Sequence, residues 1–163
     1  LITLNIGAVK NGKPGPLADA SRALSAYVQR VAPQGPSAPL FSGSGLTPEN
    51  RLSANELATM LASVYRDPVR FPALYGGMVV PRQAPFAFVR QGSRDWQDRV
   101  ALKTGTMNDP VSVCGVAGYL RKKNGGWMSF AVLVNGSEHK RHVPLYKSME
   151  AIRKDIEAIL ARY

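Results

Sequence analysis

Two segments in the first half of the chain carry apolar residues at the spacing of an amphipathic helix. The first covers residues 17–31 and stops before Pro33, a residue that cannot continue a helix. Its apolar positions are Leu17, Ala20, Leu24, Tyr27, Val28 and Val31. The second follows Ser53, which has Glu56 three residues later in a capping-box pattern, and Pro68 ends it. Its apolar positions are Leu57, Met60, Leu61 and Val64.

The last third of the chain changes to short apolar runs rich in β-branched and aromatic residues. Three such runs, over residues 100–107, 111–120 and 127–135, predict β-strands. Asn124-Gly125 lies between the second and third runs and is a strong signal for a hairpin. The pattern therefore predicts an antiparallel sheet of at least three strands.

The final segment, Val143 to Tyr163, returns to helical spacing with charges opposite the apolar face. The apolar face consists of Leu145, Met149, Ile152, Ile156, Ile159 and Leu160. Residues 69–97 show no clear period, and we expect a packed loop or short helical turns there. Together the elements predict an α+β fold in which helices flank an antiparallel β-sheet. The length of 163 residues suits one domain or a large piece of one, and we assign residues 1–163 to a single domain.

The composition is that of a folded, strongly basic chain. Hydrophobic residues make up 45% of the sequence, and no apolar run reaches the length of a membrane span. The formal net charge of +10 favours contact with polyanions such as nucleic acid, anionic lipid or cell-wall polymer. However, the basic residues are scattered, and the densest clusters are only residues 121–123 and 140–141. The single cysteine, Cys114, excludes an internal disulfide and is expected to be a buried small side chain.

The stretch "ALKTGTM", residues 101–107, combines a cation, two hydroxyl groups and a glycine at the end of a predicted strand. Alternate side chains of a strand share a face, so Thr104 and Thr106 are expected to point the same way. Gly105 has no side chain and lets a ligand approach the backbone. An ammonium group from Lys103 and two hydroxyls suit a bound carboxylate, and a free strand N–H suits a developing oxyanion.

Two segments resemble the class C penicillin-binding proteins, the D-alanyl-D-alanine carboxypeptidases and endopeptidases. "FSGSGLTPENRLSANELATML" (41–61) is similar to their G-S-G-L segment and the following helix. "VALKTGTMNDPVSVCGVAGYLRKKNGGWMSFAVLVNG" (100–136) is similar to their K-T-G strand and the two strands after it. The resemblance implies the C-terminal part of the serine β-lactamase and penicillin-binding transpeptidase-like fold. It also implies peptidoglycan stem peptides and β-lactams as ligands, no cofactor, and a periplasmic or other extracytoplasmic location in the bacterial cell envelope.

The resemblance also implies roles for individual residues. Lys103 would face the catalytic serine and the substrate carboxylate, and Thr104 and Thr106 would hydrogen-bond that carboxylate. The backbone N–H of Thr106 would form one arm of the oxyanion hole, which makes Lys103 and Thr106 the expected catalytic residues. Gly105 completes the expected substrate-binding strand. The glycines of Gly43-Ser44-Gly45 would give the G-S-G-L loop its backbone freedom beside the cleft.

The family needs two more motifs, S-x-x-K with the nucleophile and S-x-N with a proton relay. Ser137-Glu138-His139-Lys140 and Ser53-Ala54-Asn55 match as strings. Both are rejected because the first follows K-T-G and the second is a helix cap after G-S-G-L. "LITLNIGA" (1–8) resembles the tail of the helix that opens with S-x-N, so both motifs are expected upstream of Leu1. The chain is therefore expected to be the C-terminal portion of a longer enzyme, inactive alone, with the remaining N-terminal part as its partner.

Other constellations argue for ordinary structural roles. His139 and His142 lack a third metal ligand nearby, and Gly43-Ser44-Gly45 lacks the lysine of a phosphate loop. The tryptophans are expected in the core. A β-lactamase or esterase of the same fold stays open, as does a non-catalytic basic module for nucleic acid or anionic glycan. No nucleic-acid motif supports that module, so nucleic acid is not an expected partner, whereas the basic surface leaves association with a membrane surface possible.

Overall fold

The computed structural model describes residues 9, 12–13, 15–35, 39–43, 45 and 47–163. The chain divides into two compact units, Leu1–Met60 and Leu61–Tyr163. Within the described residues, the first unit contains helix α2 (Leu17–Val31), and helix α3 (Ala54–Tyr65) continues from the first unit into the second. The expected helix tail over residues 1–8 lies outside the described residues.

Both helices predicted in the first half of the sequence are confirmed. Helix α2 has the predicted bounds and ends before Pro33. Helix α3 begins with the predicted capping box: the Glu56 backbone N–H donates to Ser53 Oγ at 3.1 Å, and the Ser53 N–H donates to Glu56 Oε2 at 2.7 Å. The apolar face of α3 is only half-buried, whereas Glu56 itself is buried. The structural role assigned to Ser53, in place of a proton relay, therefore agrees with its contacts.

The second unit is built on a three-stranded antiparallel sheet in the order β1-β2-β3. The strands are β1 (Val100–Met107), β2 (Val113–Arg121) and β3 (Trp127–Asn135), so β1 and β3 have the predicted bounds and β2 is shifted by one or two residues. The β2–β3 turn forms at the predicted Asn-Gly pair. Gly125 adopts φ +88° and its N–H donates to Lys122 O at 3.0 Å, which explains the preference for glycine there.

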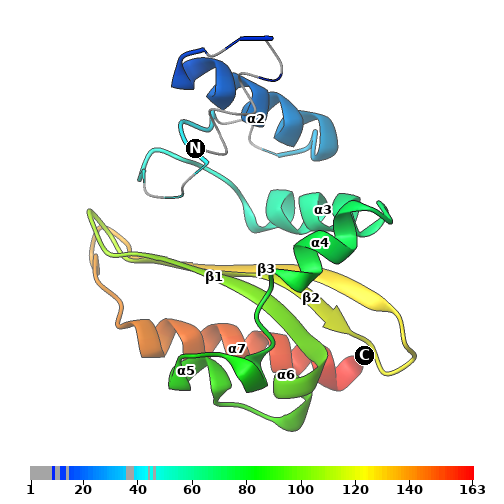
Figure 1. The fold of residues 1–163 in the computed structure, drawn as a ribbon. Helices are drawn as coiled ribbons and strands as arrows, with labels where there is room; N and C mark the ends of the chain where they lie inside the picture. The colour runs from blue at the N-terminus through cyan, green and yellow to red at the C-terminus, as the bar shows by residue number, and fades with distance from the viewer. Residues whose placement is uncertain (1–8, 10–11, 14, 36–38, 44, 46) are drawn as a thin grey trace. The chain divides into compact units, whose positions relative to one another are not determined.

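Helix α7 (Leu145–Arg162) covers one face of this sheet together with short helices α5 (Ala87–Arg90) and α6 (Arg94–Arg99), as Figure 1 shows. The core between these layers contains Trp96, Val100, Leu102, Val116, Leu120, Phe130, Met149, Ile152, Ile156 and Leu160. Every predicted apolar position of α7 packs into or against this core except Leu145. Leu145 is 38% exposed because it begins the helix, ahead of the first buried turn at Ser148 and Met149.

The opposite face of the sheet carries an aromatic cluster. The Tyr119 hydroxyl donates to Leu61 O at 2.7 Å, and the ring of Phe71 meets Tyr119 edge-to-face at 5.1 Å. Phe71 belongs to helix α4 (Arg70–Gly76), and Tyr75 of the same helix packs against Trp127 at 5.2 Å. Of the two alternatives expected for residues 69–97, a packed loop or short helical turns, the structure shows the second: α4, α5, a 3-10 turn, η1 (Pro81–Gln83), and α6, which extends to Arg99.

The expected burial of Cys114 and Trp96 is confirmed, since both are buried in the core beside α7, while Trp127 is half-buried. Burial raises the pKa of the Cys114 thiol. No helix in the described part of the chain is long and apolar enough to cross a membrane.

Candidate functional site

Strand β1 emerges from the core at the K-T-G residues. Val100, Ala101 and Leu102 are at most 2% exposed, whereas Lys103, Gly105 and Thr106 are exposed. The apolar half of the strand is fixed by the core between sheet and helices. It therefore holds the polar half in a defined position at the end of the sheet, where a ligand can reach it.

The strand alternates as the sequence predicts. Leu102 belongs to the core under α7, so Thr104 and Thr106 lie on the α7 face of the sheet, and Lys103 and Gly105 lie on the opposite face. The two threonines thus share a face, as expected. In the β1–β2 register Thr104 is opposite Val116, and Thr106 is opposite Cys114.

The outer edge of β1 presents backbone groups beside these side chains. Leu102 exchanges two hydrogen bonds with Val79, at 2.8 and 2.9 Å, so its N–H and C=O point away from β2. Because these directions alternate along an antiparallel strand, the N–H and C=O of Thr104 and Thr106 also point to the outer edge. Val79 forms the one isolated bridge in the described part of the chain, and that bridge stops at Leu102.

The lysine of K-T-G reaches the same edge. Lys103 Nζ donates a hydrogen bond to the Thr104 carbonyl oxygen at the outer edge. The Lys103 side chain therefore curls back to this edge, although it leaves β1 on the face opposite the Thr104 side chain. The ammonium group, two hydroxyls and outward peptide N–H groups therefore gather along four residues. A Cβ built on Gly105 meets nothing within 4 Å, so the strand surface beside it is open.

A cavity of about 240 Å³ lies next to this edge, and its lining contains both Lys103 and Thr104. The remaining lining residues are Gly77, Val79, Ala84, Pro85, Phe86, Val89 and Leu102. Apart from the two K-T-G residues, the lining has only apolar side chains or none. This cavity could not be expected from the sequence, because residues 77–89 have neither periodicity nor a motif.

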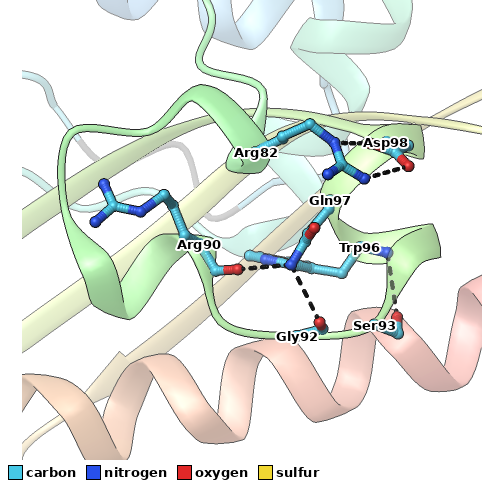
Figure 2. Close-up of polar contacts among 7 residues, drawn as sticks. All are labelled: Arg82, Arg90, Gly92, Ser93, Trp96, Gln97 and Asp98. Carbon is cyan, nitrogen blue, oxygen red and sulfur yellow. Dashed lines mark hydrogen bonds and ion pairs between the residues drawn. The ribbon is translucent and has the colours of Figure 1, made fainter.

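The wall formed by residues 81–98 is cross-linked by side chains from within the same segment (Figure 2). Arg82 pairs with Asp98, with Nη2 2.7 Å from Oδ2, and this hydrogen bond lowers the pKa of the Asp98 carboxyl. Gln97 Nε2 donates to Arg90 O at 3.0 Å, and the Trp96 N–H donates to Ser93 Oγ at 3.2 Å. These contacts fix the short helices η1, α5 and α6 and the turns between them in a defined arrangement.

A smaller cavity, of about 40 Å³, lies on the α7 side of Thr106. Its lining includes Cys114, Ser112 and Ser148, all of which are buried. Ser112 closes the neighbouring loop, since its Oγ accepts the Val143 N–H at 3.1 Å and its C=O accepts the Gly136 N–H at 2.6 Å. This polar group supports the end of the strand that carries Thr106.

Of the G-S-G-L loop, Gly43 and Gly45 are described and Ser44 lies outside the described residues. Gly45 has φ +73°, a conformation that favours glycine. Asn50 holds the start of the loop: its Oδ1 accepts the Phe41 N–H at 2.8 Å, and its Nδ2 donates to Ser42 O at 2.7 Å. Gly45 thus has the backbone freedom that the sequence predicted, while the place of the loop beside the cleft stays a prediction.

The rejected S-x-x-K string lies in an exposed turn. The Ser137 and Lys140 backbones exchange hydrogen bonds of 3.0 and 3.1 Å, and both residues are exposed. His139 and His142 are also exposed. Among the described residues, no group of three or more His, Cys, Asp or Glu side chains is arranged to hold a metal ion.

The fold defined by this sheet and its helices is that of the penicillin-binding proteins. A solved structure of penicillin binding protein 4 (dacB) from Haemophilus influenzae, complexed with a novel β-lactam, matches 95% of this chain with a TM-score of 0.72 and 15% identity. A second structure of that protein matches 93% of the chain with a TM-score of 0.70 and 17% identity. The chain spans about a third of each neighbour, 36% and 34% of their lengths. No curated protein sequence matches the chain.

The model of the D-Ala-D-Ala carboxypeptidase 3 (S13) family matches residues 1–156, and the chain belongs to that family. The kinship with class C penicillin-binding proteins that the G-S-G-L and K-T-G segments indicated is confirmed, as is the α+β fold class.

Proposed function

We propose that this chain supplies the K-T-G substrate-binding strand of a serine D-alanyl-D-alanine carboxypeptidase/endopeptidase that acts on peptidoglycan through an acyl-enzyme. The observation that carries the proposal is the outer edge of β1, where Lys103, Thr104 and Thr106 offer a cation, hydroxyls and outward N–H groups. Membership of the S13 family supports a carboxypeptidase function. The chain's share of its structural neighbours, about a third, supports assigning the nucleophile to other sequence of a longer protein.

The substrate is a peptide ending in D-Ala-D-Ala that lies along the outer edge of β1. Its terminal carboxylate accepts hydrogen bonds from the hydroxyls of Thr104 and Thr106, because two donors beside a cation match its two oxygens and its charge. Lys103 leaves the Thr104 carbonyl and turns toward this carboxylate and the serine. Gly105 leaves the strand surface bare, so the peptide approaches the backbone closely.

The reaction has two steps. The serine oxygen attacks the carbonyl carbon of the penultimate D-Ala, the C–N bond breaks, and the terminal D-Ala leaves with a proton on its nitrogen. Water then hydrolyses the ester and regenerates the serine. In both steps the carbonyl oxygen becomes an oxyanion, and the outward N–H of Thr106 stabilises it. Lys103 lowers the barrier electrostatically, since its charge offsets the carboxylate and favours proton transfer near the serine.

A serine β-lactamase shares this chemistry up to the acyl-enzyme and is separated by the next step. The full-length protein is incubated with a fluorescent penicillin and with a peptide ending in D-Ala-D-Ala. We expect a long-lived covalent adduct with the penicillin and release of D-Ala from the peptide. Rapid turnover of the penicillin without release of D-Ala would assign the protein to the β-lactamases instead. Absence of both reactions would overturn the proposal.

Peptidoglycan lies in the bacterial cell envelope, so the proposed substrate places the enzyme in the periplasm or another extracytoplasmic compartment. The chain's net charge of +10 suits association with anionic envelope polymers or a membrane surface. Fractionation of cells that express the full-length protein tests this location. Recovery with cytoplasmic markers only would contradict it.

A further inference from the structure

The cavity beside Lys103 and Thr104 is larger than the proposed reaction needs. Release of D-Ala requires room for one methyl group next to the bound carboxylate. The cavity holds about 240 Å³, and a cavity of roughly 150 Å³ already accommodates a benzene ring. A terminal methyl group would therefore leave most of this space unused.

The cavity has the chemistry of a pocket for an apolar side chain. Val79, Val89 and Leu102 line it, with Ala84, Pro85 and the ring of Phe86. The Phe86 residue is 58% exposed, and its ring stacks on that of Phe88 with centroids 5.4 Å apart. Phe86 therefore forms an aromatic rim of the cavity, and Phe88 holds this rim in place. Lys103 and Thr104 are the only polar side chains of the lining. A ligand that fits this set has a carboxylate at one end and an apolar group beside it.

The wall of the cavity is formed in advance. Trp96 Nε1 donates to Val89 O at 2.8 Å in the core, which fixes the backbone of one lining residue. Arg90 Nη1 donates to Ala84 O at 2.6 Å and to Pro85 O at 3.0 Å, which fixes two more. Figure 2 shows two further cross-links in the same segment, the Arg82–Asp98 pair and the hydrogen bonds from Gln97 to the carbonyl oxygens of Arg90 and Gly92. A pocket with fixed walls keeps its volume when empty and costs little to occupy.

We propose that this cavity is the subsite for the side chain of the peptide's C-terminal D-residue, and that it admits apolar side chains larger than methyl, such as those of D-Leu and D-Phe. The inference rests on the proposed function. The carboxylate and the side chain of a C-terminal residue branch from one Cα, so a carboxylate held at Thr104 brings the side chain to the cavity mouth. The hydrolytic step is unchanged: the same C–N bond breaks, and D-Leu or D-Phe leaves in place of D-Ala.

The test uses the full-length protein and three peptides that differ only in ending in D-Ala-D-Ala, D-Ala-D-Leu or D-Ala-D-Phe. The released amino acid is quantified, and kcat/KM is compared within the series. We expect D-Leu and D-Phe peptides to be cleaved within about tenfold of the D-Ala peptide, or faster. A site with room for methyl alone disfavours each added methylene by roughly 10- to 200-fold.

Two variants examine the cavity itself. Phe86→Ala removes the exposed rim without opening the core, and Val79→Phe fills the interior from a half-buried position. Each is expected to lower the D-Leu to D-Ala ratio of kcat/KM by about tenfold. Tyr146→Ala is the matched control, because Tyr146 is 62% exposed and lies outside the cavity lining, so its ratio should match wild type. Phe86→Ala keeps the test decisive if Val79→Phe fails to fold.

Different results would overturn the subsite and the proposed function on which it rests. Release of D-Ala with rejection of D-Leu and D-Phe, or a ratio that neither variant changes, overturns the subsite and leaves the proposed function standing. A protein that releases no D-amino acid and forms no penicillin adduct overturns the proposed function, and the subsite with it. Cleavage of the larger residues together with a ratio that falls in Phe86→Ala, and stays at wild type in Tyr146→Ala, supports the subsite.

Discussion

Glycines play opposite roles at one position of β1, the strand that carries K-T-G, and at one position of its neighbour β2. Gly118 on β2 has no room for a side chain, since an added Cβ would come within 2.0 Å of Ala101 O, a backbone atom of β1. Gly105 on β1 has open space, with no atom within 4 Å of an added Cβ. The first glycine therefore serves the packing of the sheet, whereas the second leaves a surface bare.

A pair of alanine substitutions separates these roles. Gly118→Ala is expected to lower the free energy of unfolding by about 1–3 kcal/mol, because the backbone of β1 must move to admit the methyl group. Gly105→Ala is expected to stay within about 0.5 kcal/mol of wild type in stability. In the full-length protein Gly105→Ala should slow acylation by penicillin, since the added methyl group would occupy the strand surface along which the substrate is proposed to bind. Urea unfolding and acylation rates measure the two effects, and equal loss of stability in both variants would contradict the assignment.

Lys103 allows a second test at the same scale. Lys103→Ala in the full-length protein is expected to lower the second-order acylation rate by about ten- to a hundredfold, the equivalent of roughly 1.5–3 kcal/mol for a charge-assisted contact. Removal of this exposed lysine should change stability by only about 0.5 kcal/mol. Thr104→Val should be milder, because Thr106 keeps one hydroxyl on the carboxylate. A Lys103→Ala protein with a lowered melting temperature and normal acylation would make the lysine structural.

The sequence predicts the polar residues of the site better than its shape. Strand alternation and the K-T-G string place Lys103, Thr104 and Thr106 together, because both are local properties of one strand. The cavity beside them could not be predicted. Val79 and Phe86 reach it through a loop whose form depends on contacts such as Trp96 with Val89, and these contacts leave no period or motif in the sequence.

At the scale of elements, the last carbonyl groups of helix α7 accept hydrogen bonds from basic side chains of other segments. Arg99 on α6 donates from Nη1 to Leu160 O at 3.2 Å, and Lys123 in the β2–β3 turn donates from Nζ to Ala161 O at 3.1 Å. The last carbonyl groups of a helix lack partners within the helix and carry partial negative charge, so both contacts are favourable. The sequence shows many basic residues, but its pattern does not indicate which of them contact the C-terminal end of α7.

Substitution of each cation by methionine ranks these contacts. Arg99→Met is expected to lower the free energy of unfolding by about 1–2 kcal/mol, because it also removes a 2.8 Å hydrogen bond from Nε to Arg121 O and an ion pair with Asp95. Lys123→Met should cost only about 0.3–1 kcal/mol, since its contact is exposed. Chemical denaturation of both variants measures the order. A larger loss of unfolding free energy in Lys123→Met than in Arg99→Met would show that the C-terminal end of α7 depends on the β2–β3 turn more than on α6.

Elements with strong local signals are the ones the sequence places correctly. Helix α2 and strands β1 and β3 have the predicted bounds, because a proline, a change of period or an Asn-Gly turn marks their ends. Helices α4 to α6 were expected only as short turns, since they are too short to establish a helical period. Their positions are set by tertiary contacts, such as Phe71 with Tyr119.

On the scale of the whole molecule, all three strands, including the proposed substrate-binding strand β1, lie within the second unit, Leu61–Tyr163. A core shared by β1, β2, β3 and α7 supports them, and Cys114 is buried within it. Burial raises the pKa of this thiol, so it should react slowly with thiol reagents near neutral pH while the unit is folded. Labelling with a chromogenic disulfide, with and without denaturant, checks this expectation. Fast labelling without denaturant would show that the sheet opens readily beside Thr106.

The last prediction concerns this chain without further sequence. In the proposed function the K-T-G strand binds and polarises a substrate and the nucleophile lies on other sequence, so the 163 residues alone should neither hydrolyse D-Ala-D-Ala peptides nor form a covalent adduct with penicillin. The S-x-x-K string at Ser137 does not alter this expectation. Ser137 lies in an exposed turn, and its Oγ accepts the Lys140 backbone N–H at 3.2 Å, so no contact with the lysine ammonium activates it.

Fluorescent penicillin and mass spectrometry of the intact chain provide the measurement, with the full-length protein as the positive control and Ser137→Ala as the matched variant. We expect no adduct on the chain, one adduct on the full-length protein, and the same full-length result after Ser137→Ala. A stable adduct on the chain that maps to Ser137 and disappears in the variant would place the nucleophile in the turn after β3. The assignment of K-T-G to one half of a divided active site would then be wrong.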